Sequence, residues 1–352
     1  MTYRGIAMAD WDDVIDLTKL SGWLAEQGFG NAPIEGASLL VGGTQNFLLR
    51  FQHNDRDVVL RRPPRHLRAN SNETMRREAR VLAAIADTNV PHAKLIAACG
   101  DEAVIGAAFY LMEPVDGFNP TTGLPEFHAS DPKVRHRMGM ALVEGIAALG
   151  QVDYRKVGLE GFGKPDGFLE RQVGRWQSQL DSYAAFEAWP GAAGLPGVDR
   201  VAKWLNDQVP VTFQPGILHG DYHLANVMYQ PHTPELAAIV DWELSTIGDP
   251  LLDLGWLMAT WPDPNGAGLG AVGTTPWEGF PRIEEMISHY AERSARNLDA
   301  ISWYGVLACF KLGIILEGTY ARACVGKAPK DIGDQLHATT IGLFKRAQTL
   351  MA

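Results

Sequence analysis

The chain has 352 residues, a formal net charge of −10, 46% hydrophobic and 20% charged residues, as expected of a folded globular protein. The acidic balance argues against nucleic acid as the main partner, because nucleic-acid backbones are bound by clustered basic side chains. Its apolar runs fall short of the ~20 residues that cross a bilayer, so we expect no membrane partner. Its three cysteines are far apart, so we expect no disulfide framework. Its first residues lack an apolar signal core, so we expect a cytoplasmic protein.

The first part of the chain has the pattern of an α+β lobe. Short apolar runs separated by glycine, asparagine or proline predict strands, and runs with apolar residues at helical spacing predict helices. We expect helices over 13–28 and 72–87, and strands over 37–41, 47–51, 58–61 and 108–112. We assign residues 1–113 to a nucleotide-binding N-lobe and residues 114–352 to a C-lobe with the catalytic loop and the acceptor site.

The C-lobe is predicted to be mostly helical. Two irregular connections, over 184–197 and 262–273, have the composition of surface loops. The expected helices are 133–149, 168–183, 198–207, 283–297, 300–320 and 331–351. They are interrupted near 217–243 by a segment with a different pattern.

A glycine turn between the first two predicted strands is a candidate phosphate-binding loop. Glycines let backbone N–H groups approach phosphate closely, so Gly42, Gly43, Thr44 and Asn46 are candidate nucleotide contacts. A Gly-Gly pair between strands is also a common hairpin turn, and only the downstream motifs favour the phosphate interpretation. At the end of the N-lobe, the backbone around Glu113 is a candidate for contact with the adenine edge.

The third strand predicts a cation for the nucleotide phosphates. Its end, Val-Val-Leu-Arg, matches the kinase template Val-Ala-Ile-Lys and places Arg61 at the template lysine. Arg62 is the rival, because neighbouring strand residues face opposite sides. Glu78, in the middle of the next helix, is the preferred partner of this cation. Glu73 is the alternative, although at the helix start an acid serves the helix dipole.

The segment from His219 to Asn226 carries the strongest functional signal. Its pattern His-x-Asp-x-x-x-x-Asn, followed by Asp241-Trp-Glu, corresponds to the H-R-D-x-x-x-x-N and D-F-G motifs of protein kinases. Phosphoryl transfer needs a carboxylate near the attacking hydroxyl and oxygen ligands for Mg²⁺ beside the phosphates. Asp221 fits the first role, and Asn226 and Asp241 fit the second.

The residues between the two motifs predict a β-hairpin. Residues 226–229 and 236–240 are apolar, and the connection between them is rich in turn residues. Such a hairpin would carry Asn226 and Asp241 back towards each other, so that one metal ion could bridge them. An aspartate in a glycine-containing loop is more often a turn residue or a helix cap, but the second aspartate and the Gly248–Leu254 segment favour a phosphotransferase.

Together these segments resemble the aminoglycoside phosphotransferase and choline kinase superfamily, in particular the kinase-like domain fused to some acyl-CoA dehydrogenases. Two departures concern the glycine turn, where Gln45 replaces a frequent serine, and the Leu149–Asp153 segment, which lacks a frequent histidine. The matching segments include 42–46, 59–64, 77–82, 109–113, 157–159, 171–176, 219–226, 241–243 and 248–255.

The resemblance implies a two-lobed protein-kinase-like fold with a small, mainly-β N-lobe and a larger, mainly helical C-lobe. It implies ATP and Mg²⁺ as cofactors and transfer of the γ-phosphate to a hydroxyl of a small molecule. It gives Asp221 the role of catalytic base, and it gives Asn226 and Asp241 the role of metal ligands. It also places Asp253 on the helix behind the catalytic loop, where it would hold the loop backbone.

The resemblance suggests a hydroxyacyl-CoA as the acceptor. Arg155, Arg171 and Arg175 are candidate contacts to its phosphates, although surface helix charge is the more common reason for such arginines. Around the catalytic residues, Tyr222, Trp242 and Glu243 are candidate acceptor contacts, and Trp242 could equally be core. These assignments follow from the family likeness rather than from residue spacing.

Two alternative functions stay open at this stage. One is an aminoglycoside kinase of the same fold, and the other is a nucleotide-binding protein without catalysis. The intact set of Asp221, Asn226 and Asp241 argues against the second alternative. A protein-substrate kinase is disfavoured because no long activation segment ending in Ala-Pro-Glu follows Asp241. The sequence sets no oligomeric state.

Overall fold

A computed structural model describes residues 11, 13–40, 46–263 and 272–352 of the chain. The chain divides into two compact units, Met1–Thr88 with His92–Asp116 and Asn89–Pro91 with Gly117–Ala352. The expected boundary after residue 113 lies just before Asp116. Three of the predicted nucleotide contacts, Gly42, Gly43 and Thr44, lie outside the described residues.

The N-terminal unit is built on a five-stranded antiparallel sheet with the order β1-β2-β3-β5-β4. One strand, β4, was not expected from the sequence, because its two central alanines have a low preference for strands. It is paired along its length with β5, so tertiary context overrides its composition. The strands are β1 Glu35–Leu39, β2 Phe47–His53, β3 Arg56–Arg62, β4 Leu95–Cys99 and β5 Phe109–Met112.

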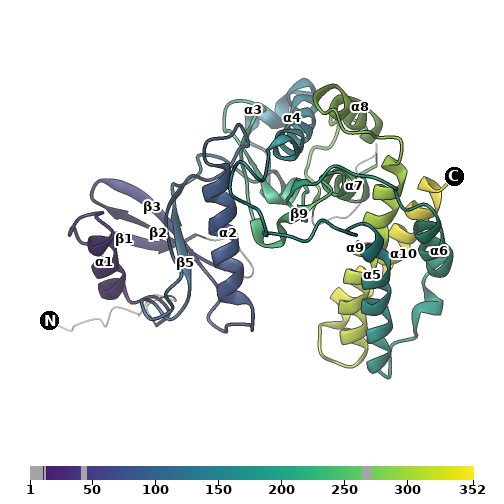
Figure 1. Cartoon of the computed structure of the whole chain (residues 1–352), viewed down its shortest axis with the longest axis horizontal. Helices are drawn as coiled ribbons and strands as arrows, with labels where there is room; N and C mark the ends of the chain where they lie inside the picture. Colours follow the sequence, from purple (N-terminus) through teal and green to yellow (C-terminus); the bar gives the residue numbers. More distant parts are fainter. Residues whose placement is uncertain (1–10, 12, 41–45, 264–271) are drawn as a thin grey trace. The chain divides into compact units, whose positions relative to one another are not determined.

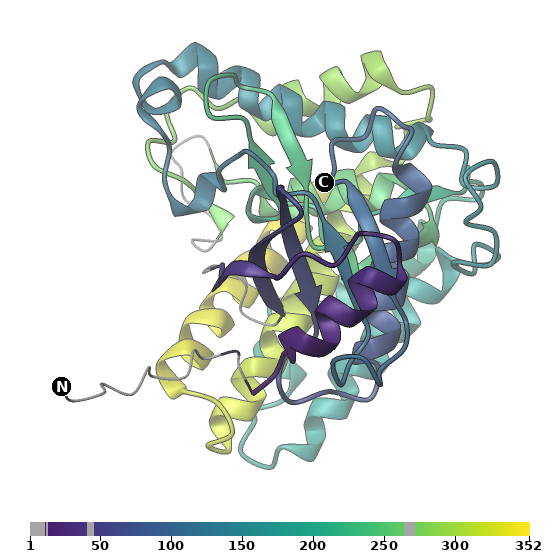
Figure 2. The same cartoon turned by 90° about the vertical axis from the view of Figure 1, so that its left-hand side faces the viewer.

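Two helices belong to the two faces of this sheet, α1 (Leu17–Glu26) and α2 (Ser71–Ile85) (Figures 1 and 2). Asp16 caps α1 by accepting hydrogen bonds from the N–H groups of Thr18 and Lys19 at 3.0 and 3.1 Å. Alternation along β2 and β3 sends one set of apolar side chains to the α1 face, where they form a core with that helix. The opposite face carries Arg61 towards α2.

The C-terminal unit is mainly helical, as predicted. Figure 1 shows α9 and α10 lying side by side. The short helix α3 and the helix α7 were not expected from the helical periodicity. The helices are α3 Glu126–Ser130, α4 Pro132–Gln151, α5 Glu170–Ser182, α6 Val198–Asp207, α7 Leu251–Thr260, α8 Ile283–Arg293, α9 Ile301–Cys324 and α10 Lys330–Leu350.

Helix α9 is the central helix of this unit. By length and mean hydropathy (1.4) it could cross a membrane, contrary to our expectation that no apolar run approaches that length. However, 67% of its most apolar window is buried inside the protein, which is typical of a core helix. Trp303 and Phe310 on α9 are fully or almost fully buried. The helix therefore has an apolar surface because it packs inside the unit.

Two small antiparallel pairs hold the predicted catalytic segment. In one pair β6 (Gly216–Leu218) lies beside β9 (Thr246–Gly248), and in the other β7 (Val227–Tyr229) lies beside β8 (Leu236–Ile239). The β7–β8 hairpin is the one predicted from the sequence, whereas β6 and β9 were too short to be recognised. The molecule thus has the expected α+β fold, with an antiparallel-sheet N-terminal unit and a mainly helical C-terminal unit.

Candidate active site

The carboxylate of Asp221 is oriented by two side-chain hydrogen bonds. The indole N–H of Trp256 donates to Oδ1 at 2.9 Å, and the amide of Asn226 donates to Oδ2 at 3.0 Å. The imidazole Nε2 of His223 lies 3.3 Å from Oδ1. Trp256 comes from α7, while the other two groups belong to the catalytic loop itself. The carboxylate is therefore fixed in direction before any substrate binds.

The backbone of the catalytic loop is held from α7 and α9. Asp253 accepts hydrogen bonds from the N–H groups of His219 and Gly220 at 2.7 and 2.8 Å, as the resemblance implied. The ammonium group of Lys311 donates to the Gly220 carbonyl at 3.1 Å. Burial raises the pKa of Asp253 to about 6, although its two N–H donors oppose this shift. The turn before Asp221 is thus fixed at both its N–H groups and a carbonyl.

Gly220 is required by the conformation of this turn. Its φ is +88°, a region that strongly favours glycine, and an added Cβ would come within 2.5 Å of the Leu244 carbonyl oxygen. Any other residue would push the 219–221 turn away from the segment after β8. The glycine of the motif therefore sets the direction in which Asp221 leaves the turn.

His219 links the catalytic loop to the strand before Asp241. Its Nε2 lies 2.9 Å from the Val240 carbonyl oxygen, and its Nδ1 accepts from the Asp221 N–H at 3.4 Å. These two bonds assign one N–H and one acceptor nitrogen to the ring, which is the neutral form. Complete burial lowers the pKa of His219, which also favours the neutral ring. His219 therefore stabilises the catalytic loop through hydrogen bonds and is not a candidate acid or base.

The hairpin brings the two candidate metal ligands together in the backbone. The Val240 N–H donates to the Asn226 carbonyl at 3.0 Å, so Asp241 follows immediately after a residue paired with Asn226. Asp241 itself has φ +67° and ψ +63°, a left-handed conformation that non-glycine residues rarely adopt. Such backbone strain is common where a side chain must point in one direction at a functional site.

The amide of Asn226 fits the role of a metal ligand. Its nitrogen donates to the Asp221 backbone carbonyl at 2.9 Å and to the Asp221 carboxylate at 3.0 Å. Both donor hydrogens point to Asp221, so the amide oxygen is directed elsewhere. An amide oxygen and a carboxylate from Asp241 are the hard ligands that Mg²⁺ prefers. The residues present therefore fit a magnesium ion.

Asp221 is ionised throughout the physiological pH range. Its burial would raise its pKa, but the hydrogen bond and charge of His223, together with the charge of Lys311, outweigh burial and lower the pKa to about 2. A carboxylate with such a low pKa is a weak base in the ground state. It is better suited to accept a hydrogen bond from the attacking hydroxyl and to take its proton late in the reaction.

Lys311 and Trp256 were not singled out from the sequence. The ammonium group of Lys311 lies 4.2 Å from the ring centre of Trp256 and 5.6 Å from that of Trp176. The guanidinium of Arg175 lies 5.2 Å from the same Trp176 ring. Burial lowers the pKa of Lys311 to about 8, although the charges of Asp221 and Asp253 oppose this shift. The available signal was a lysine in the middle of an otherwise apolar stretch of α9.

In the N-terminal unit, Arg61 and Glu78 form the predicted pair. The Arg61 Nε lies 3.0 Å from Glu78 Oε2, Arg61 Nη2 donates to Oε1 at 3.4 Å, and the Tyr110 hydroxyl donates to Oε2 at 2.9 Å. The Glu78 side chain is fully buried. Arg62, the rival cation, is buried on the other face and donates to the Val14 carbonyl at 2.6 Å. Arg61 is therefore the better candidate for the phosphates.

The remaining N-terminal candidates are placed as follows. Asn46 is partly buried and immediately precedes β2. Glu113 follows β5, its N–H donates to the Lys94 carbonyl at 2.9 Å, and its side chain is exposed. Glu73 lies in the first turn of α2 with an exposed side chain 3.9 Å from Arg76, so it is not the partner of Arg61. Neither position tests a contact with a nucleotide, so the roles of Asn46 and Glu113 stay predictions.

Of the candidate acceptor contacts, Tyr222 is a core residue instead, and Trp242 takes the core position that the sequence had left open. Tyr222 is fully buried and its hydroxyl donates to the Leu142 carbonyl at 2.7 Å. Trp242 is almost fully buried, and its indole N–H donates to the Ile239 carbonyl at 3.1 Å. Both aromatic rings pack against His219, so they support the loop rather than face an acceptor. Glu243 is partly buried.

Two of the three candidate arginines for an anionic acceptor make local contacts. Arg171 donates to the Asp166 and Lys164 carbonyls and so closes the turn before α5. Arg155 lies 3.9 Å from Glu160 and stacks over Tyr154 at 4.9 Å. Arg175 differs because it shares the Trp176 ring with Lys311.

Comparison with known proteins identifies the class. A model of the phosphotransferase enzyme family (APH) matches residues 37–285, more than half of the chain, so the chain belongs to this family. Acyl-CoA dehydrogenase family member 11 of Gallus gallus is 31% identical over 297 residues, which is 81% of the chain and 36% of that protein. The chain spans about a third of the length of the curated relatives it matches.

Solved structures agree with this assignment. A candidate aminoglycoside phosphotransferase of Ralstonia eutropha JMP134 is 28% identical with a TM-score of 0.78, over 95% of this chain and 99% of its own. Aminoglycoside phosphotransferase APH(4)-Ia, solved as a ternary complex with ADP and hygromycin B, is 14% identical with a TM-score of 0.56, over 94% and 98% of the two chains. The second likeness shows the fold alone.

Proposed function

We propose that the protein transfers the γ-phosphate of ATP to a hydroxyl of a small molecule, with a hydroxyacyl-CoA as the first acceptor to test. The observation that carries the proposal is the arrangement around Asp221. Its carboxylate is held by Trp256 and Asn226, and Asn226 is joined through the hairpin to Asp241. Membership of the phosphotransferase enzyme family, and a structural neighbour that binds ADP, support a nucleotide as the donor.

In the proposed reaction, Asp221 accepts a hydrogen bond from the acceptor hydroxyl. This contact directs the hydroxyl oxygen towards the γ-phosphorus of ATP. As the new O–P bond forms, the bond to the leaving ADP oxygen breaks and the hydroxyl proton passes to Asp221. A magnesium ion held by Asn226 and Asp241 would neutralise charge on the phosphate oxygens. Arg61, fixed by Glu78, would bind phosphate in a bidentate way. Asp221 and Arg61 thus act mainly by positioning the acceptor hydroxyl and the phosphates of ATP.

Two basic side chains beside Trp176 support an anionic acceptor. Lys311 and Arg175 both contact the Trp176 ring, and Lys311 also contacts the Trp256 ring that orients Asp221. Two cations at this position would attract the phosphates of a CoA thioester and repel a polycationic aminoglycoside. Curated relatives are named as acyl-CoA dehydrogenase family members, and this supports testing an acyl-CoA acceptor first.

An aminoglycoside kinase is the second candidate. The observation that favours it is the likeness to the Ralstonia eutropha structure, which is described as a candidate aminoglycoside phosphotransferase. The two candidates differ in the sign of the acceptor charge. They can therefore be separated by acceptor panels and by charge variants.

The test measures ADP release from Mg·ATP with hydroxyacyl-CoAs, the corresponding free hydroxy acids, hygromycin B, choline and homoserine. We expect acceptor-dependent release with a hydroxyacyl-CoA, lost in Asp221→Ala while ATP still binds. Arg175→Gln should raise the KM for that acceptor, whereas Arg200→Gln, an exposed arginine on α6, should not change it. Release with hygromycin B alone would replace the acyl-CoA proposal, and turnover by Asp221→Ala would overturn the mechanism.

A further inference from the structure

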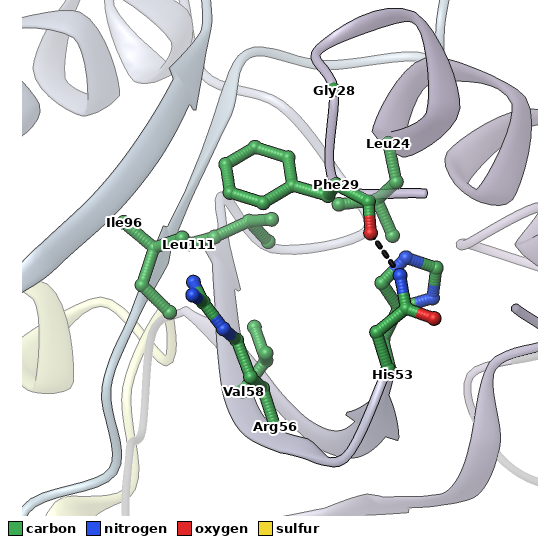
Figure 3. Close-up of a pocket in the computed structure, with 9 residues that line it drawn as sticks. Leu24, Gly28, Phe29, His53, Arg56, Val58, Ile96 and Leu111 are labelled. Atoms are coloured by element: carbon green, nitrogen blue, oxygen red, sulfur yellow. Dashed lines mark hydrogen bonds between the residues drawn. The ribbon is translucent and has the colours of Figure 1, made fainter. Parts of the chain in front are cut away.

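A cavity in the N-terminal unit lies on the sheet face that α1 covers. It has a volume of about 420 Å³ and is bordered by α1, the loop after it, the β2–β3 turn and the strands β2, β3, β4 and β5. Figure 3 shows these side chains around the cavity. The lining residues are Leu24, Gly28, Phe29, His53, Asn54, Arg56, Val58, Ile96 and Leu111.

The cavity belongs to the opposite sheet face from Arg61 and Glu78. In the β2–β3 register Phe51 is opposite Val58 and His53 is opposite Arg56, so these four residues project to one face. Arg61, an odd number of residues from Val58 on the same strand, projects to the other face. The cavity is therefore separate from the candidate phosphate-binding pair.

His53 is the unusual residue of this cavity. Its side chain is 4% exposed, and neither ring nitrogen has a hydrogen-bond partner among the residues that the structure describes. An unpaired polar group buried in an apolar surrounding lowers the stability of the fold. An apolar residue in place of His53 would avoid the unfavourable free energy of burying these ring nitrogens. A ligand that forms hydrogen bonds with the His53 ring would also offset it.

The edge of the cavity also carries a cation. Arg56 lies directly across the hairpin from His53, its side chain is exposed at the cavity edge, and the described part of the chain gives its guanidinium no ion-pair partner. Figure 3 shows the guanidinium reaching towards Ile96, with the Phe29 ring above it and His53 on the other side. The rest of the lining is mostly aliphatic or aromatic.

The mouth of the cavity is held in place by a turn. Asn54 and Asp55 both have positive φ (49° and 57°), which is the geometry of a tight two-residue hairpin turn. From this turn the Asn54 amide donates a hydrogen bond to the Phe29 carbonyl (Figure 3). The contact ties the loop after α1 to the hairpin, so the cavity is formed before a ligand binds.

We propose that this cavity binds a small amphipathic monocarboxylate, with the carboxylate between His53 and Arg56 and the hydrocarbon chain against Phe29, Val58 and Leu111. A volume of about 420 Å³ lies in the range of small-molecule sites. A carboxylate accepts hydrogen bonds from both the imidazole N–H and the guanidinium. The apolar walls exclude a nucleotide or a sugar as the preferred ligand.

The test is isothermal titration of the full chain with octanoate and with neutral octanamide. We expect octanoate to bind one site and octanamide to bind about tenfold more weakly, because a hydrogen bond to a charged group is lost. Arg56→Gln and His53→Leu should each weaken octanoate binding by about tenfold. Lys19→Gln removes one exposed positive charge from α1, away from the cavity, and should bind octanoate like the wild type.

Stability gives a second, independent readout. His53→Leu replaces an unpaired buried ring with an apolar group, so its Tm without ligand should be equal to or above that of the wild type. At the same concentration, octanoate should raise the Tm of the wild type and of Lys19→Gln by more than that of the other two variants. Absence of octanoate binding by the wild type, or equal binding by wild type, Arg56→Gln and His53→Leu, would overturn the proposal.

Discussion

The two units fix their candidate functional groups in different ways. In the N-terminal unit, Arg61 is positioned by one buried acid, Glu78, which is held in turn by Tyr110. In the C-terminal unit, the catalytic loop receives contacts from two helices and a hairpin, with separate partners for each backbone and side-chain group. The candidate cation of the first unit thus contacts a buried acid directly, whereas in the second unit the contacts to the catalytic loop are distributed over a network.

The largest effect should come from the carboxylate at the centre of the network. Asp221→Asn keeps the size of the side chain but removes its charge and its ability to take a proton. We expect kcat to fall by about a thousandfold, the usual contribution of a positioned general base. ATP titration should show unchanged binding. The control is Glu187→Gln, which changes an exposed side chain outside the catalytic segment. A fall in kcat of less than tenfold for Asp221→Asn would argue against the role of Asp221.

The next effect should show how far the N-terminal unit depends on the Arg61–Glu78 pair. Glu78→Gln removes the buried charge that lies 3.0 Å from the Arg61 guanidinium, so the free energy of unfolding should fall by about 3 kcal/mol in urea titrations. The double variant Arg61→Met/Glu78→Leu should recover part of this loss. It should nevertheless bind ATP poorly. Normal ATP affinity in the double variant would remove Arg61 from the phosphate site.

A smaller effect is expected from one contact of the network. Trp256→Phe removes the indole N–H that donates to Asp221 and keeps most of the packing. We expect about a tenfold loss in kcat with little change in the KM for ATP, because one hydrogen bond to a charged group is lost. Steady-state kinetics over both substrates give the two parameters. If instead kcat were unchanged, the direction of the carboxylate would be set by Asn226 and His223.

The smallest effect at neutral pH concerns Lys311. Its pKa is lowered to about 8, so the folded protein loses this charge as the pH rises through that value. We expect kcat/KM to fall above pH 8 in the wild type and to be flat in Lys311→Met, as measured by a pH–rate profile. The unfolded chain keeps the proton up to pH ~10.4, so the stability of the wild type should rise between pH 8 and 10.4 relative to the variant.

Much of the site could be predicted because the relevant residues lie close together in sequence. The spacing of Asp221 and Asn226, the apolar runs of the β7–β8 hairpin and the template match at Arg61 all rest on local patterns. The pairing of Arg61 with Glu78 follows from placing an acid in the middle of a helix next to the strand. In each case the residues are close in sequence, so the chain allows them only a few relative positions.

The network could not be predicted because its members are far apart in sequence. Trp256 and Lys311 reach the catalytic loop from helices that follow it, and no local pattern links an indole or a lysine to an aspartate so many positions earlier. Tyr222 was misassigned and Trp242 was left open for a related reason, since an aromatic residue beside a catalytic group can face either the acceptor or the core. Strand β4 was missed, and helix α7 was expected only from the family resemblance, because their composition is ambiguous without tertiary context.

The position of Lys311 on α9 has a consequence for how the protein is made. All three motif residues, Asp221, Asn226 and Asp241, are synthesised before residue 300, but the donor to the Gly220 carbonyl comes only afterwards. A fragment ending at residue 300 would keep every recognisable kinase motif and lack one anchor of its catalytic loop. The loop therefore gains its full set of backbone contacts only after residue 311 has been synthesised.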